Sequence, residues 1–245
     1  MNVPWSILIL IAVLVIPAHG EKRDVSFNAA DGLSLQGTLY SSDKPVPGVL
    51  LLHQCDANRQ INDHLATMLN SADYSVLTFD FRSFGDKPSP RVQMLTAQQQ
   101  KSMASDIDTA LSFLKSQSNV NPRAVGVVAA NCAVNEAVHA AQRHPEIRTL
   151  VLLSGGTDAE GEAYIKNSPN VSILGVASDE DQDAASAIKK LVALSPDSYS
   201  QLEMLSNAGH AAAMFAKQPE LEADIVVWFR TNLSVGGYGL PPAIK

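Results

Sequence analysis

An apolar run passes directly into a helical pattern in the segment Val125-Gly-Val-Val-Ala-Ala-Asn-Cys-Ala-Val-Asn-Glu-Ala137. Small residues, Ala129 and Ala133, lie two positions before and two positions after Asn131. A sharp strand-to-helix turn brings backbone segments into close contact, so it needs small residues at these two positions, as in the Gly-x-Ser-x-Gly pattern of a nucleophile elbow. The segment therefore predicts an elbow with Asn131, an amide rather than a hydroxyl, at its tip.

A second register of this elbow places Cys132 at the tip. A thiolate is a competent nucleophile when a neighbouring histidine lowers its pKa. This register would put Val134 at the second small position, where a β-branched side chain should clash. The steric argument favours Asn131, and Cys132 is then the residue after the tip. Both registers remain open at the level of sequence.

Apolar runs alternate with amphipathic patterns along most of the chain. Residues 25–28 and 33–40 predict a β-hairpin that turns at Gly32. Continuous apolar strands alternating with helices are typical of a mostly parallel sheet covered on both faces. Further strands are predicted at 48–53, 74–80, 124–130, 149–154, 171–177 and 200–205, and helices at 61–70, 98–115, 134–143, 184–193 and 221–232.

The first twenty residues have the features of a secretory signal peptide. Residues 5–17 are almost wholly apolar, and Ala18-His-Gly20 supplies a small-x-small cleavage pattern before a charged stretch. The apolar run is shorter than the ~20 residues that a membrane-spanning helix needs. We therefore expect a signal peptide at 1–20, one α/β domain at 21–234, a flexible C-terminal tail at 235–245, no membrane span in the mature chain, and a secreted or periplasmic location.

Composition excludes several classes of partner. A net charge of −7 leaves no basic stripe to neutralise phosphates, which argues against nucleic acid. The two cysteines, Cys55 and Cys132, form no Cys-x-x-Cys pair, and no glycine-rich phosphate loop or His-x-x-x-His pair occurs. The sequence predicts no cofactor, no metal and a small-molecule partner. The oligomeric state cannot be predicted.

Several motifs occur in the order found in one hydrolase fold. Residues 76–85 resemble a strand ending in Asp-x-Arg-Gly-x-Gly, and residues 48–55 resemble an oxyanion-loop strand in which His-Gly is commoner than the His-Gln found here. Ala208-Gly-His210 resembles a histidine loop. Together with the elbow, these motifs make residues 33–233 similar to the α/β-hydrolases, and most similar to their dienelactone hydrolase-like branch.

The resemblance implies a set of site residues. Its chain order of nucleophile, acid and histidine maps onto Asn131 or Cys132, then Asp181, then His210. Asp179 and Asp183 compete with Asp181, which we favour because the family acid falls some ten residues after the start of its strand. The same resemblance assigns the oxyanion loop to Gln54 and Cys55, with the backbone N–H groups of Cys55 and Cys132 as the oxyanion donors.

The resemblance also implies a function and a cross-link. The function is an exported hydrolase of a small ester, lactone or thioester with an atypical nucleophile. The alternative is a catalytically impaired binding protein that uses the same cleft, because Asn131 cannot replace a serine hydroxyl. In this fold the two oxyanion donors are near neighbours, so we predict that Cys55 and Cys132 form a disulfide or lie within easy reach of one.

Overall fold

The computed structural model describes residues 21–82 and 96–233. The predicted signal peptide, the predicted tail at 235–245 and residues 83–95 lie outside the described residues. The described strands are β1 (Lys22–Asn28), β2 (Ser34–Tyr40), β3 (Val46–Leu52), β4 (Ser75–Phe79), β5 (Val120–Ala130), β6 (Ile147–Leu153), β7 (Ser172–Ser178) and β8 (Gln201–Leu205). The helices are η1 (Arg59–Asn62), α1 (Asp63–Ser71), α2 (Ala97–Lys115), α3 (Ala133–Arg143), α4 (Ala159–Lys166), α5 (Gln182–Leu194), α6 (Ala213–Lys217) and α7 (Glu220–Asn232).

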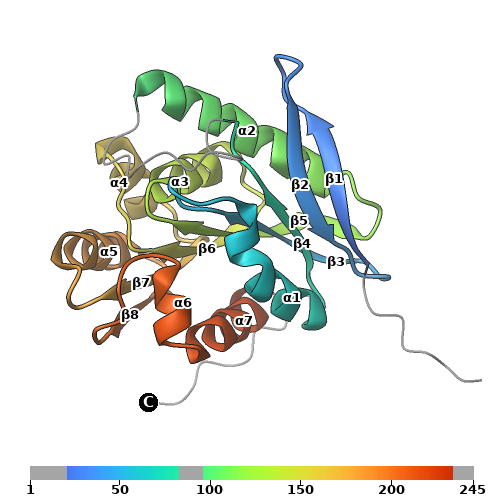
Figure 1. Ribbon diagram of the computed structural model, residues 1–245. Coiled ribbons are helices and arrows are strands. Elements are labelled where there is room, and N and C mark those ends of the chain that lie inside the picture. The colour runs from blue at the N-terminus through green and yellow to red at the C-terminus, as the bar shows by residue number, and fades with distance from the viewer. Residues whose placement is uncertain (1–20, 83–95, 234–245) are drawn as a thin grey trace, which may run out of the picture.

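The eight strands form one sheet in the order β1-β2-β4-β3-β5-β6-β7-β8 (Figure 1). Strands β1 and β2 pair antiparallel, and β2 pairs antiparallel with β4. From β4 across to β8 every neighbouring pair is parallel. The predicted mostly parallel sheet and the predicted N-terminal hairpin are both confirmed.

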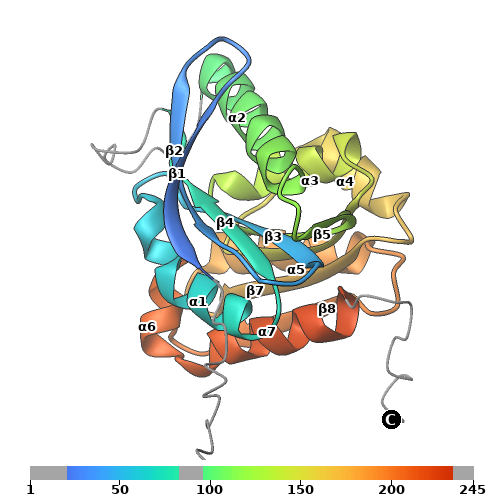
Figure 2. The same cartoon turned by 90° about the vertical axis from the view of Figure 1, so that its right-hand side faces the viewer.

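Helices cover both faces of the sheet, as the two views in Figures 1 and 2 show. Helices α2, α3, α4 and α5 pack on one face, and α1, α6 and α7 pack on the other. Alternate residues of a central strand therefore enter different cores: Leu50 of β3 packs in the first, and Leu51 in the second. Burial on both faces explains why these strands read as continuous apolar runs rather than alternating ones.

Two helices were missed by the sequence prediction. Helix α4 is short and contains Gly161, which weakens the helical pattern. Asp158 offsets this weakness because its carboxylate accepts a hydrogen bond from the Gly161 N–H at the start of the helix. Helix α6 has five residues, too few for an apolar period to be recognised.

The carboxyl ends of the parallel strands meet at one edge of the sheet. In open α/β sheets this edge carries the ligand sites. The loops after β3, β5, β6, β7 and β8 all contribute residues to a single cavity there. The topology thus brings together the predicted oxyanion loop, elbow and histidine loop, although they are far apart in the sequence.

Candidate functional site

The turn between β5 and α3 has the backbone of an elbow with Asn131 at its tip. Asn131 has a φ of 52°, in the left-handed region, whereas Cys132 has a φ of −61° and caps the start of α3. Asparagine tolerates the left-handed region better than most non-glycine residues. The flanking Ala129 and Ala133 are fully buried. The backbone therefore has the register in which Asn131 lies at the tip and Cys132 follows it.

Close packing explains why the residues around this tip are small. The Asn131 N–H donates to the carbonyl of Leu153 at the end of β6, at 2.9 Å. A Cβ atom added to Gly155 would lie 2.5 Å from the Asn131 carbonyl oxygen. A backbone oxygen cannot move aside as a flexible side chain can, so position 155 excludes every other residue type at this geometry. The β6 loop thus confines the elbow from one side.

Asp181 and His210 form a hydrogen-bonded pair at the same edge. The Nδ1 atom of His210 pairs with a carboxylate oxygen of Asp181. Asp179 makes other bonds: it accepts from the Asn207 N–H at 2.9 Å and from the Ser206 hydroxyl at 3.1 Å. These bonds, the Asn207 N–H first, lower the pKa of Asp179. Of the three carboxylates weighed from sequence, Asp181 is thus the one bonded to the histidine.

The histidine loop, residues 206–212, is held by side chains from several strand ends. Three of its residues have left-handed backbone: Asn207, Gly209 and Ala211. Such a loop cannot satisfy its N–H groups within itself, and unpaired buried N–H groups are costly. Side chains accept these bonds instead: Asp179 from Asn207, Ser178 from Ala208, Glu180 from Gly209, Ser154 from Ala211 and Gln54 from Ala212.

Gln54 connects the loop after β3 to the histidine loop. Its side-chain oxygen accepts from the Ala212 N–H at 3.0 Å, and its amide nitrogen donates to Asp56 at 2.6 Å. The glycine that is commoner at this position in the resembling family has no side chain that could make these bonds. Gln54 therefore supports the position of His210 through the Ala212 N–H two residues further along. This role could not be predicted from the sequence, because the two partners are 158 residues apart.

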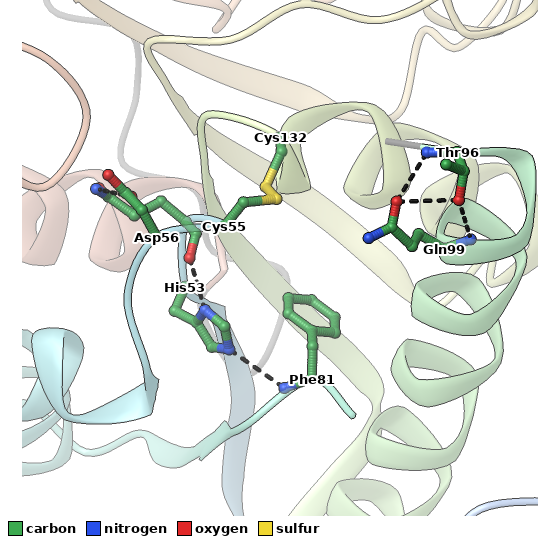
Figure 3. The surroundings of a disulfide bond; sticks show 8 residues. His53, Cys55, Asp56, Phe81, Thr96, Gln99 and Cys132 are labelled. Carbon is green, nitrogen blue, oxygen red and sulfur yellow. Dashed lines mark hydrogen bonds between the residues drawn. A yellow bond between two sulfur atoms is a disulfide. The ribbon is translucent and has the colours of Figure 1, made fainter. Parts of the chain in front are cut away.

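Cys55 and Cys132 form a disulfide, with Cα atoms 6.0 Å apart (Figure 3). This distance lies within the normal range for a disulfide, so the predicted cross-link is present. The bond joins the loop after β3 to the residue that follows the elbow tip. The two cysteines are 77 residues apart, and closing a loop of that length contributes on the order of 4 kcal/mol in the chain-entropy model. While bonded, Cys132 carries no thiolate.

A cavity of about 950 Å³ lies at this site, and five of the six predicted site residues line it: Gln54, Cys55, Asn131, Asp181 and His210. The sixth, Cys132, is not part of its wall. That volume is within the range of sites for small organic ligands. Apart from Cys55, the nonpolar residues of its wall are Gly or Ala. The larger side chains of the wall are therefore polar or charged. Those that bear on the chemistry are Gln54, Asn131, Ser154, Asp181 and His210, and Asp183 and Cys55 also lie in the wall.

His53, the first residue after β3, is buried, and its hydrogen bonds determine its protonation state. Its Nδ1 lies 2.7 Å from the Gln54 carbonyl oxygen, and its Nε2 accepts from the Phe81 N–H at 3.2 Å (Figure 3). The first contact requires a proton on Nδ1 and the second requires a lone pair on Nε2, so the ring is neutral. Burial also favours the neutral ring: it penalises the charged form and so lowers the pKa of His53.

Protonation of His53 is expected to destabilise the fold on mild acidification. Because the folded pKa lies below the unfolded value, the unfolded chain holds one more proton between the two. The stabilisation is complete above about pH 6.5 and is lost as the pH falls towards the folded pKa, at up to about 1.4 kcal/mol per pH unit. Urea unfolding of wild type and His53→Gln between pH 5 and pH 8 measures it. Parallel stability curves would contradict this assignment.

Among residues 21–82 and 96–233, no group of three or more His, Cys, Asp or Glu side chains is placed to hold a metal ion. Within the same residues no helix has the length and apolar character needed to cross a bilayer.

Solved structures of similar fold include a dienelactone hydrolase and an esterase. The described architecture superposes on a dienelactone hydrolase from Anabaena variabilis with a TM-score of 0.70 and 16% identity, over 88% of this chain and all of that one. An esterase from Pyrococcus furiosus, Pf2001, gives a TM-score of 0.66 at 16% identity, over 88% of this chain and 94% of that one. The chain therefore has the α/β-hydrolase fold, as predicted from its sequence.

Relatives found by sequence match only about half of this chain. The thiohydrolase aneE of Aspergillus aculeatus is 27% identical over 129 residues, which are 52% of this chain and 40% of that protein. The protein Rv2307c of Mycobacterium tuberculosis is 30% identical over 142 residues, 57% of this chain and 47% of that protein. The chain thus spans less than half the length of these relatives. No family model matches the sequence.

Proposed function

We propose that this protein is an exported hydrolase of a small ester, lactone or thioester, with an atypical group at the nucleophile position. The observation that carries the proposal is the Asp181–His210 pair in the cavity that also contains the elbow tip. A histidine oriented by a carboxylate beside an elbow is the proton-transfer machinery of acyl hydrolysis. The thiohydrolase name of one relative supports including thioesters.

The mechanism uses water because Asn131 cannot form an acyl intermediate through a hydroxyl. The Nε2 atom of His210 takes a proton from a water molecule as the water oxygen attacks the substrate carbonyl carbon. Asp181, bonded to Nδ1, stabilises the imidazolium that forms. The backbone N–H groups of Cys55 and Cys132 bind the oxyanion of the tetrahedral intermediate. His210 then returns the proton to the leaving group, and the Asn131 amide holds the substrate carbonyl or the water.

Binding without catalysis is the second candidate function. It is favoured by one observation, the amide at the tip of the elbow, where acyl transfer through the chain requires a hydroxyl or thiol. The same cavity would then hold a ligand, with the Asn131 amide bonded to a ligand carbonyl. The intact Asp181–His210 pair weighs towards chemistry, because a binding site has no need of an oriented base.

Export is part of the proposal and has its own support. The apolar N-terminal segment with its cleavage pattern is one line, and the Cys55–Cys132 disulfide is the other. Disulfides persist in oxidising compartments and are rare in the cytosol. Detection of a processed N-terminus near residue 21 in the periplasmic or culture fraction would test this part.

The test of the function is a panel of p-nitrophenyl esters and acyl thioesters with short acyl chains, assayed with wild type and His210→Ala. Hydrolysis by wild type that His210→Ala reduces by 10²-fold or more supports the proposal, because general base catalysis contributes about 10²–10⁴-fold. Absence of turnover on the panel, together with saturable binding of a substrate by wild type, would favour the binding function instead.

A further inference from the structure

The disulfide lies just beyond the carboxyl ends of two neighbouring strands, β3 and β5. Leu52 of β3 is the register partner of Ala129 of β5. Cys55 lies three residues after Leu52, and Cys132 lies three residues after Ala129. The cross-link therefore ties together the first turns of two loops at the point where the strand hydrogen bonds have ended. Figure 3 shows the bond passing from the loop after β3 to the start of α3.

Among the described residues, the hydrogen bonds that anchor these two loops run to other elements. The loop after β3 is anchored to other elements: through Gln54 to the histidine loop, and through His53 to Phe81 after β4. The elbow is anchored to β6 through the Asn131 N–H and Leu153. Neither set of bonds joins Cys55 to Cys132. The disulfide is thus the direct connection between the two residues to which the proposed mechanism assigns the oxyanion donors.

We propose that the Cys55–Cys132 disulfide is a positioning element that sets the spacing of the oxyanion donors, so that its reduction lowers turnover in a protein that stays folded. This inference rests on the proposed function. Two donors must lie at hydrogen-bond distance from one oxygen atom, and preorganisation is what makes such donors effective. Because the oxyanion develops only in the transition state, a looser spacing lowers kcat and leaves KM nearly unchanged.

Reduction can be performed without a thiol that would itself cleave esters. A water-soluble phosphine attacks one sulfur and breaks the S–S bond, and water hydrolyses the resulting thiophosphonium. The products are two cysteine thiols and a phosphine oxide, so the disulfide gains two electrons and two protons and the phosphorus gains the oxygen of water. Cys55 is 2% exposed and Cys132 is more accessible, so attack is expected at the Cys132 sulfur, with Cys55 as the leaving thiolate.

The experiment compares four forms of the protein with p-nitrophenyl acetate: oxidised wild type, phosphine-reduced wild type, the Cys55→Ala/Cys132→Ala double variant, and Trp228→Phe. The reduced form and the double variant are expected to lose about 10–100-fold in kcat, below the 10²–10³-fold loss of a whole donor. KM should stay within about twofold. Reoxidation of the reduced wild type after removal of the phosphine should restore kcat, while the far-ultraviolet circular dichroism is unchanged throughout.

Trp228→Phe is the matched control for lost stability. It removes the buried bond from Trp228 Nε1 to the Thr149 hydroxyl, at 2.8 Å, near the amino end of β6 and away from the cavity. It should lower the melting temperature without changing kcat. The inference is overturned by an unchanged kcat in the reduced, folded protein, or by an equal loss of kcat in Trp228→Phe.

A binding measurement separates this inference from the proposed function. The monoanion of p-nitrophenyl methylphosphonate is tetrahedral and carries charged oxygens, so it mimics the oxyanion without being turned over by the proposed mechanism. Calorimetry should give a Kd at least about 10-fold lower for oxidised than for reduced wild type. If no ester is hydrolysed but this difference appears, the function fails and the positioning role stands. Equal affinity or no binding in both states overturns the positioning role.

Discussion

Asn131→Ser is expected to raise the rate of p-nitrophenyl acetate hydrolysis by about 10²- to 10⁴-fold over wild type. The substitution places a hydroxyl at the elbow tip, where the backbone already has the φ of 52° of that position. His210, oriented by Asp181, could then take the hydroxyl proton as the oxygen attacks the ester carbonyl. Stopped-flow measurement of p-nitrophenolate release should show a burst from an acyl-enzyme, which a water-activating wild type lacks.

Asn131→Ala is the matched control for this gain. It removes the same amide and keeps the same backbone demand, but it supplies no nucleophile. Both variants lose the tolerance of asparagine for left-handed backbone, so their melting temperatures should fall by similar amounts. The gain should disappear when His210→Ala is added to Asn131→Ser. An equal rate for the serine and alanine variants would show that the tip residue does not face the reacting carbonyl.

The strands were predictable because their burial is uniform. In β3 and β5 both faces are covered by helices, so the apolar runs are continuous. The start of β5 was predicted four residues too late, at 124 instead of Val120, because the strand contains the polar residues Asn121 and Arg123. Helix α2 was predictable from its apolar period, and it begins at a Thr96–Gln99 capping box. Helix α4 was not, because it depends on one capping carboxylate and on packing against α3 and α5.

Only those site residues that belong to a motif with a known chain order could be predicted. Asp181 and His210 followed from their chain order, and the neighbouring cysteines from the geometry of the resembling fold. The anchors of the histidine loop, among them Ser154 and Ser178, lie at the ends of other strands and meet the loop only when the sheet is assembled. A serine at a strand end has no distinguishing pattern in one sequence. Knowledge of which strands are neighbours is needed to find it.

Asp181→Asn is expected to lower kcat by on the order of 10³–10⁴-fold in the Asn131→Ser background. Asp181 accepts from Nδ1 of His210, which keeps the proton off Nε2 and leaves that nitrogen able to act as a base. An amide at position 181 can donate to Nδ1 instead, which favours the tautomer with the proton on Nε2. That tautomer cannot accept a proton from the hydroxyl. Steady-state kinetics with p-nitrophenyl acetate should show the loss in kcat.

Asp183→Asn separates this tautomer effect from a loss of negative charge. Asp183 lines the same cavity two residues further along, in the first turn of α5, and the substitution removes the same unit of charge. It should cost about 0.3–1 kcal/mol of stability, because a carboxylate near a helix N-terminus interacts favourably with the helix dipole. Its kcat should stay within a few-fold of the parent. Of these two carboxylates, Asp181 is the one bonded to His210. Equal losses of kcat from the two substitutions would therefore mean that both carboxylates act through their negative charge, and that the bond to His210 does not determine the tautomer.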